Sequence, residues 1–223
     1  GATGSCSSAE VVGCGTFAAT DSDGTATQTY SIVAVGTNSA SVDHDLFAVA
    51  AGGVLTFSSA PNYEAAGCGA GNDANTCTVV IQVTDGANTD TILVTATVTD
   101  LNEHTPSFTD GATDTCSSAE VVGCGTFAAT DADGTATQTY SIVTSGNNAA
   151  SVDHDLFTVA SGGVLTFSSA PNYEAPGCGA GNNANTCVVV ISVTDGANTD
   201  TITITATVTD LVIDITAAAP TIA

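Results

Sequence analysis

Residues 78–98 read TVVIQVTDGANTDTILVTATV, and residues 188–208 repeat this run with few changes as VVVISVTDGANTDTITITATV. Val, Ile and Thr dominate both runs, and such β-branched residues favour strands. Apolar residues alternate with polar ones over short stretches, and Asp-Gly, Gly-Gly and Asn-rich segments separate these stretches as turns would. Leu and Glu are scarce and Lys, Arg and Met are absent, so helix signals from these residues are almost missing. The pattern predicts an all-β protein.

An internal repeat divides the chain. The stretch that begins at Gly1, GATGSCSSAEVVGCGTFAATDSDGTATQTYSIV, returns from Gly111 as GATDTCSSAEVVGCGTFAATDADGTATQTYSIV. Residues 1–100 align with residues 111–210 without a gap, so both copies should fold alike. A unit of about 110 residues with about seven strands is typical of a β-sandwich. We therefore predict repeats at 1–100 and 111–210, a linker with the first strand of repeat 2 at 101–110, and a C-terminal tail at 211–223.

The charge composition restricts the partners. The 223 residues include 23 acidic side chains and no Lys or Arg, for a formal net charge of −23. Nucleic acid is excluded as a partner, because a phosphate backbone needs cationic side chains to replace its counterions, and anionic membrane surfaces are disfavoured for the same reason. No apolar run approaches the roughly 20 residues of a membrane span, so membrane insertion is not expected. The carboxylates must either spread over a solvated surface or gather around a bound cation.

Eight cysteines recur at equivalent places in the two copies, which favours a disulfide framework formed in an oxidising compartment. Zinc ligation is the alternative, but CxxC pairs are absent and the histidines lie elsewhere. Four cysteines in a repeat allow three connectivities. We expect local pairing, because Gly-rich loops join the near neighbours: Cys6–Cys14, Cys68–Cys77, Cys116–Cys124 and Cys178–Cys187. The sequence starts at Gly1 without a Met, so we expect a processed chain that is secreted or held at the cell surface.

Acidic motifs surround the junction of the two copies. The junction reads DLNEHTPSF from Asp100 to Phe108, which resembles the DxNDNxPxF linker of cadherin repeats. Other stretches fall where that family has its acidic motifs: Glu10, Asn62-Tyr63-Glu64, Asp131-Ala132-Asp133 and Val193-Thr194-Asp195-Gly196. The APNYE and VTDGANTDT stretches are nearest in style to microbial cadherin-like repeats. The resemblance covers essentially the whole chain and implies two tandem cadherin-like β-sandwiches, with an immunoglobulin-like Greek key, joined by a calcium-binding linker.

The resemblance also implies the metal ligands. Calcium takes six to eight oxygen ligands and favours several carboxylates supplemented by carbonyl groups. Carried over, the ligands nearer the first repeat are Glu10, Glu64, Asp100, Glu103 and the Leu101 carbonyl. Those nearer the second repeat are Asn102, the His104 carbonyl, Asp131 and Asp195, and Asp133 serves both groups. Asn62 replaces a carboxylate of the family motif and Glu103 is longer than the usual Asp, so two or three Ca²⁺ ions are expected.

Competing interpretations of the polar residues have less support. Acidic residues in Asp-Gly and Asn-rich loops can simply form turns. The Asp43-His44-Asp45 motif, repeated as Asp153-His154-Asp155, could ligate a transition metal, but it also resembles a polar loop that precedes a strand. No GxSxG motif occurs, the histidines lie in loop or linker motifs, and metal ligation already explains the clustered carboxylates. We therefore expect that the protein is not an enzyme.

Three functions fit such a chain. It can be the protomer of an extracellular filament or surface layer whose joints calcium stiffens. It can be an adhesin fragment that binds a protein or glycan on another cell, or a calcium-dependent, lectin-like binding module. A binding module should show an exposed aromatic platform or a loop that differs between the copies. The copies are nearly identical and Trp is absent, which favours the structural protomer.

The segments that flank the two copies differ. Pro106-Ser107-Phe108 precedes the second copy and corresponds to the start of the family's first strand, whereas the first copy begins at Gly1 without it. An incomplete sheet edge is open to pairing with another strand. Residues 219–223, APTIA, resemble TPSFT at 105–109. We therefore predict a head-to-tail homopolymer in which the tail of one chain pairs with the first repeat of the next, with an acidic joint formed by Asp21, Asp23, Asp85 and Asp210.

Overall fold

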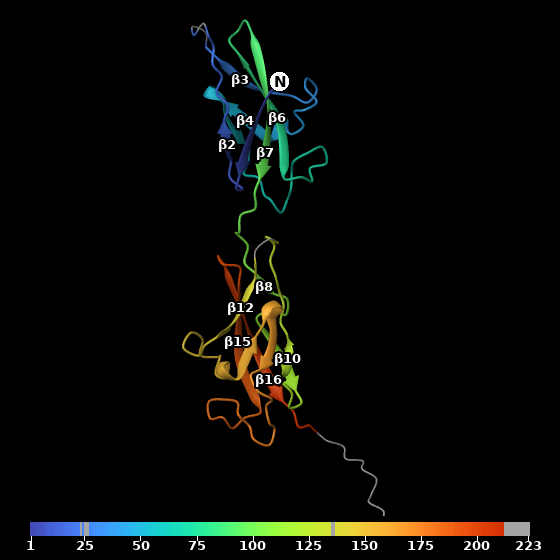
Figure 1. Ribbon diagram of the computed structural model, residues 1–223, viewed down its shortest axis with the longest axis vertical. Coiled ribbons are helices and arrows are strands. Elements are labelled where there is room, and N and C mark those ends of the chain that lie inside the picture. The colour runs from blue at the N-terminus through green and yellow to red at the C-terminus, as the bar shows by residue number, and fades with distance from the viewer. Residues whose placement is uncertain (23, 25–26, 135–136, 212–223) are drawn as a thin grey trace, which may run out of the picture. The chain divides into compact units, whose positions relative to one another are not determined.

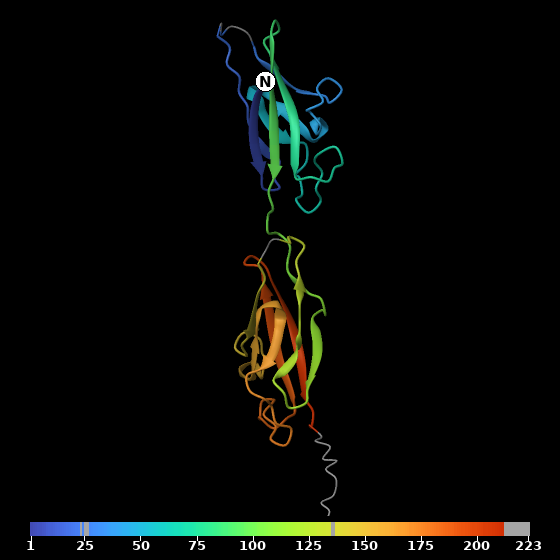
Figure 2. The same cartoon turned by 45° about the vertical axis from the view of Figure 1, so that its right-hand side comes forward.

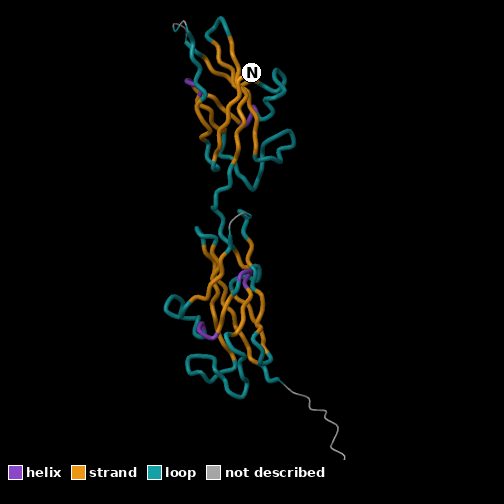
Figure 3. The backbone as a smooth tube through the Cα atoms, viewed as in Figure 1, coloured by secondary structure: helices purple, strands orange, loops and turns teal. Residues whose placement is uncertain are grey.

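The computed structural model describes residues 1–22, 24, 27–134 and 137–211. These residues form two compact units, which divide between Leu101 and Asn102. Strands make up nearly all the regular structure of the described residues, and the helices are short 3-10 turns (Figure 3). These turns are η1 His44–Leu46, η2 Ala51–Gly53, η3 His154–Leu156 and η4 Ser161–Gly163. No described helix is long and apolar enough to cross a membrane.

Unit 1 is a sandwich of two sheets. Its strands are β1 Ala2–Ser8, β2 Gly13–Thr16, β3 Thr29–Val33, β4 Phe47–Ala50, β5 Val54–Phe57, β6 Thr76–Thr84 and β7 Thr89–Val98. One sheet has the order β1-β7-β6-β3 and the other β2-β5-β4. β1 runs parallel to β7, and the other strand pairs are antiparallel. Residues 78–98 therefore contribute the central antiparallel pair of the larger sheet (Figure 1).

Unit 2 repeats this arrangement and adds one short strand pair. Its strands are β8 Ser107–Phe108, β9 Thr113–Ser118, β10 Gly123–Thr126, β11 Ala129–Thr130, β12 Thr139–Val143, β13 Phe157–Val159, β14 Val164–Phe167, β15 Thr186–Thr194 and β16 Thr199–Val208. The sheets have the orders β12-β15-β16-β9 and β10-β14-β13, and β8 pairs with β11. In both units the long strands run side by side (Figure 2). The prediction of two tandem β-sandwiches is confirmed.

Alternation along the central strands builds the core of each unit. In β7, Val94, Ala96 and Val98 are at most 2% exposed, while the Thr residues between them face outward to varying degrees. Phe47 and Phe57 pack beside them with ring centroids 4.4 Å apart. This burial follows from the two-residue period of a strand, which places every second side chain on one face. The central strands thus supply β-branched side chains to a core that also contains Phe, Leu, Ala and disulfide-bonded Cys.

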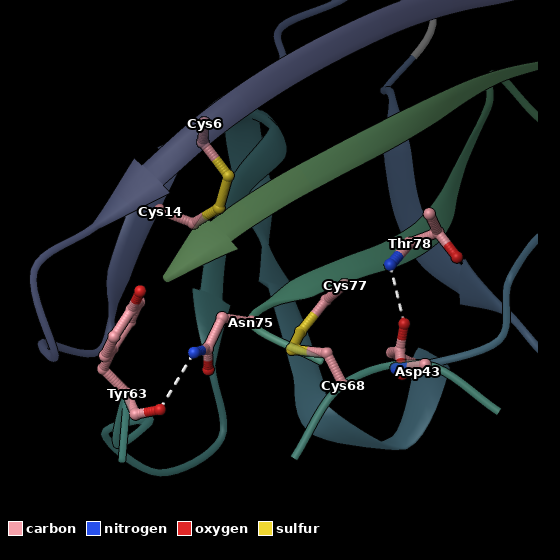
Figure 4. Close-up of a disulfide and its surroundings, with 9 residues drawn as sticks. Cys6, Cys14, Asp43, Tyr63, Cys68, Asn75, Cys77 and Thr78 are labelled. Carbon is pink, nitrogen blue, oxygen red and sulfur yellow. Dashed lines mark hydrogen bonds between the residues drawn. A yellow bond between two sulfur atoms is a disulfide. The ribbon is translucent and has the colours of Figure 1, made fainter. Parts of the chain in front are cut away.

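All eight cysteines form disulfides, and the predicted local pairing is confirmed. The bridges are Cys6–Cys14, Cys68–Cys77, Cys116–Cys124 and Cys178–Cys187. They fall into two kinds, because Cys68 and Cys77 are 2% and 0% exposed whereas the Cys6–Cys14 bridge is only partly buried (Figure 4). The partners are separated by 8 or 9 positions in the sequence, so each bridge closes a short loop.

Replacing the buried bridge by alanine should destabilise unit 1 more than replacing the partly buried one. Both bridges close loops of similar length, and the chain-entropy model gives about 2.5 kcal/mol for each. The Cys68→Ala/Cys77→Ala pair also leaves a cavity in the core, which adds to the cost. Urea unfolding measures the difference, with Cys6→Ala/Cys14→Ala as the matched control. Equal losses in the two double variants would contradict a contribution from burial.

A buried carboxylate holds the loop that the Cys68–Cys77 bridge closes. Asp43 is 3% exposed, and its Oδ1 and Oδ2 accept the N–H groups of Gly69 (2.6 Å) and Thr78 (2.7 Å). Figure 4 shows the bond to Thr78 beside the disulfide. The Nδ1 of His44 lies 3.2 Å from the Ser41 carbonyl, and Asp45 is exposed. The motif is therefore a structural clamp ahead of β4, and its equivalent Asp153 makes the same pair of bonds in unit 2.

Candidate metal centre

Two loops of unit 2 bring acidic side chains together. Asp131 and Asp133 follow β11, and Asp195 begins the turn between β15 and β16. Gly134 and Gly196 adopt φ values of 64° and 101°, which only glycine adopts readily, so the chain can turn sharply directly after each acidic residue. The strand order of the sandwich thus places at one end of the unit residues that lie more than sixty positions apart.

The carboxylates of these loops converge on a small volume. Asp131, Asp133 and Asp195 each offer an oxygen, and these oxygens all lie within 4.8 Å of one another. Asp133 is only 3% exposed. Asp131 Oδ1 accepts the N–H of Asp133 at 3.1 Å, while Asp131 Oδ2 is enclosed and accepts no hydrogen bond from any described residue. A buried carboxylate oxygen without a donor is costly, and a bound cation would compensate for it.

The linker adds a fourth side chain to this cluster. The Asn102 amide nitrogen donates to Asp133 Oδ2 at 2.9 Å and to Asp195 Oδ2 at 3.0 Å. These two bonds hold the side chain of the linker residue against the cluster. The three carboxylates of the cluster fit calcium, which prefers hard oxygen ligands.

The side chain of His104 also takes part in the cluster, although the motif resemblance implied only the His104 carbonyl. Its Nδ1 lies 2.6 Å from Asp133 Oδ1, and its N–H donates to Asp133 Oδ2 at 3.0 Å. The carbonyl of His104 accepts a bond from Asn198 Nδ2 at 2.8 Å. A His two positions before a Pro carries no sequence signal of such a contact. Asn198 belongs to the repeated GANTD stretch, but no ligand motif includes it.

Backbone hydrogen bonds keep one member of the cluster ionised. The N–H of Asn198, with that of Ala197, donates to Asp195 Oδ1 and lowers the pKa of this carboxyl below its usual value of 3.8, although desolvation opposes the shift. Protons therefore compete with a cation for Asp195 only at more acidic pH than for an ordinary Asp.

Unit 1 carries the other predicted ligands, arranged around Glu10. Its Oε1 accepts the N–H of Tyr63 and its Oε2 the N–H of Leu101, both at 2.9 Å. Glu10 has φ 54°, so its backbone occupies the left-handed region. The carboxylate thus joins the chain before β2, the loop before β6 and the last residue of the unit. Asp100 is partly buried beside Leu101, and Glu64 is exposed.

The same arrangement recurs at the end of unit 2. Glu120 accepts the N–H groups of Tyr173 (3.1 Å) and Leu211 (2.9 Å). These bonds lower the pKa of Glu120 below 4.5. In both units, therefore, a carboxylate from the loop after the first long strand holds the N–H of a Leu that follows the last strand, and an Asp lies just before that Leu.

The residues predicted for a joint between chains fall into two groups. Asp21 and Asp85 line one cavity of about 230 Å³ in unit 1, as expected from their equivalence to Asp131 and Asp195. The N–H groups of Asn88 and Ala87 lower the pKa of Asp85 below 3.8. Asp23, the counterpart of Asp133, lies outside the described residues, and Asp210 belongs to unit 2.

No protein-family model matches the sequence, and neither does any curated protein sequence. Solved structures do match. The EC1-2 fragment of human protocadherin-24 is similar over 93% of this chain and 94% of its own length, with a TM-score of 0.63 and 18% identity. The EC1-4 fragment of Drosophila N-cadherin is similar over 94% of this chain and 48% of its own length, with a TM-score of 0.65 and 14% identity.

A third match is a four-repeat fragment of protocadherin gamma B2, domains 3–6, with a TM-score of 0.68 and 16% identity over 94% of this chain and 51% of that fragment. Identities this low establish the fold alone. The motif resemblance seen in the sequence and the structural matches agree on that fold, since each of these matches covers both units. The protein is a tandem pair of cadherin-like β-sandwich repeats.

Proposed function

We propose that this protein is a calcium-stiffened extracellular structural protein, the protomer of a head-to-tail filament or surface assembly. The observation that carries the proposal is the convergence of oxygens from Asp131, Asp133 and Asp195 in unit 2, with one carboxylate oxygen enclosed and unbonded. The chain contains no Lys or Arg that could neutralise these carboxylates. A divalent cation is the partner that such a cluster requires.

Chain connectivity supports a stiffening role for the ions. Leu101, whose N–H is held by Glu10, is followed directly by Asn102, whose side chain lies against Asp133 and Asp195 of unit 2. A cation bound to these carboxylates would therefore fix the linker one residue after its anchor in unit 1. We propose that Glu10, Glu64, Asp100, Glu103 and the Leu101 carbonyl supply the ligands from the unit 1 side of the linker, and that the His104 carbonyl joins the unit 2 ligands. Two or three ions are proposed in all.

The extracellular location is proposed from the disulfides and the fold. Disulfides form and persist in oxidising compartments, and this chain has four. One of the matching structures is described as extracellular cadherin domains. With a net charge of −23, we expect no nucleic-acid partner, and metal ligation accounts for the clustered carboxylates without any enzymatic role.

A calcium-dependent adhesin is the second candidate, and an exposed apolar turn supports it. Val11 and Val12 are 55% and 49% exposed, and their counterparts Val121 and Val122 are 54% and 48% exposed. Negative-stain microscopy with and without chelator separates the two candidates. Filaments that disperse on chelation support the structural protomer, whereas separate chains at every concentration favour the adhesin.

The full chain should bind two or three calcium ions after chelator treatment, as measured by isothermal titration calorimetry. Asp133→Asn should weaken at least one site tenfold or more, because Asp133 is shared by the two proposed groups of ligands. Asp45→Asn is the matched control, since Asp45 is exposed and lies outside the cluster. The absence of binding heat, or equal effects of the two substitutions, would refute the assignment.

A further inference from the structure

Unit 1 has an open groove between its larger sheet and the segment that follows β2. The groove measures about 420 Å³ and is lined by both polar and apolar groups, and its larger apolar side chains are Phe17, Tyr30, Ile81, Val83 and Ile92. Phe17, Val83 and Ile92 are all partly exposed there. Exposed apolar surface in a sheet groove commonly marks a binding site for another segment.

The repeat shows what fills the equivalent groove in unit 2. Phe127 and Ile202 are the counterparts of Phe17 and Ile92, yet they are only 3% and 0% exposed. The difference comes from the segment that precedes the repeat. Pro106 is fully buried, and Phe108 is 3% exposed within the same apolar cluster, 6.2 Å from the ring of Tyr140.

Backbone bonds hold this segment in place. In unit 2 the Phe108 N–H donates to Asp200 Oδ2 (3.1 Å), and the Thr109 N–H donates to the Ala128 carbonyl (3.0 Å). The counterparts of these acceptors, Asp90 and Ala18, line the groove of unit 1. Unit 1 therefore presents the apolar side chains and both hydrogen-bond acceptors that would hold such a strand. Within the described residues, the segment at Ala19–Thr20 that matches β11 forms no strand.

We infer that the groove of unit 1 binds the tail of a second copy of this chain, with Pro220 and Ile222 at the places of Pro106 and Phe108. This inference rests on the proposed head-to-tail assembly and names its contact. The sequence APTIA at 219–223 aligns with TPSFT at 105–109, so a Pro is followed two positions later by a large apolar residue in both. Phe108 already fills the groove of unit 2, so the tail binds the groove of unit 1 in another copy.

The tail is long enough to reach from Leu211 to the groove of unit 1 in another copy. Leu101 and Leu211 are equivalent anchors, since each donates its N–H at 2.9 Å to a Glu. Phe108 follows Leu101 by seven residues, and Ile222 follows Leu211 by eleven. An extended chain advances about 3.3 Å per residue. The tail can therefore make the connection that residues 102–108 make, with four residues to spare.

Sedimentation velocity of the full chain in calcium, over a range of concentrations, tests the contact. The wild type should associate as concentration rises, Ile222→Asp should weaken association tenfold or more, and Ile222→Phe should strengthen it. Ile215→Asp, in the same tail but outside the matching stretch, is the control and should associate like the wild type. An unassociated wild type, an Ile222→Asp variant that associates normally, or tail docking without concentration dependence overturns the inference.

A second variant supplies the strand within the chain. Adding the sequence of residues 105–110 in front of Gly1 should fill the groove, block association and raise the Tm of unit 1 by about 5 °C. The same extension with Asp in place of its Phe should do neither. A rise in Tm without any wild-type association would show that the groove seats such a strand and that the tail is not its occupant, which overturns the inference. Calcium binding measured on the same samples shows independently whether the proposed function holds.

Discussion

Chelating calcium should lower the Tm of the protein by more than about 10 °C relative to a solution with 10 mM calcium. Sites in extracellular modules bind with Kd of about 10⁻⁴ to 10⁻³ M, so 10 mM calcium exceeds Kd by about 10- to 100-fold. Mass action then contributes about 1.4 to 2.7 kcal/mol for each ion. Two ions would contribute about 3 to 5 kcal/mol, and each kcal/mol shifts the Tm of a domain of this size by about 4 to 8 °C.

Loss of the ions also exposes repulsion that they mask. Without a cation, the carboxylates of Asp131, Asp133 and Asp195 face one another within 4.8 Å, and the described part of the chain places only His104 against them as a basic group. Like charges at that distance destabilise the folded state. Differential scanning calorimetry with calcium, with chelator and with calcium restored measures the shift and its reversibility.

The control is a variant in which the cluster is already disabled. Asp133→Ala should have a low Tm in calcium and respond little to chelator, whereas Asp45→Ala should behave like the wild type. Small-angle scattering on the same samples should show a broader range of interdomain angles for Asp133→Ala. A wild-type Tm that does not change on chelation would rule out a structural role for calcium.

Asp43→Ala should destabilise unit 1 by about 2 to 4 kcal/mol. The carboxylate accepts the N–H groups of Gly69 and Thr78, and its removal leaves both without an acceptor in a partly buried loop. Each unsatisfied buried group costs about 1 to 3 kcal/mol. Asp43→Asn should cost nearly as much, because an amide offers one oxygen and would point its NH₂ group at the other N–H.

Urea unfolding followed by circular dichroism measures this loss as a shift of one of two transitions, since the repeats need not unfold together. Asp45→Ala is the control two positions away, and its exposed side chain should change stability by no more than about 0.5 kcal/mol. Asp153→Ala should produce the equivalent shift in unit 2, because Asp153 makes the same pair of bonds. A neutral Asp43→Ala variant would mean that the clamp contributes nothing to stability.

The class of the fold was predictable because its causes are local. Val, Ile and Thr at alternating positions in 78–83 and 91–98 favour strands wherever they occur, and the structure has β6 and β7 there. Near-identical copies fold alike, so the repeat predicted two sandwiches. The disulfides were predictable for the same reason, because Gly-rich loops let cysteines 8 or 9 positions apart meet without help from the rest of the fold.

The motifs also identified the acidic residues of the unit 2 cluster, but their surroundings depend on contacts between distant segments. His104 Nδ1 approaches Asp133 because the linker packs against the loop that follows β11, where Asp131 Oδ2 is enclosed as well. The sequence left metal ligation as the weaker alternative for Asp43, because its neighbours are His44 and Asp45. Its bonds to Gly69 and Thr78 show that its partners lie far along the chain.

Phe17 and Phe127 show most clearly the difference between what local sequence predicts and what tertiary packing decides. Both lie in the same local sequence, GTFAATD, and both follow a short edge strand, so local rules predict one environment for them. Phe127 is 3% exposed and Phe17 is more exposed, because a segment from outside the repeat covers only the second. The strands, the repeats, the local disulfides and the acidic motifs follow from local sequence. Which of two identical side chains is buried does not, because burial depends on the segment that packs over it.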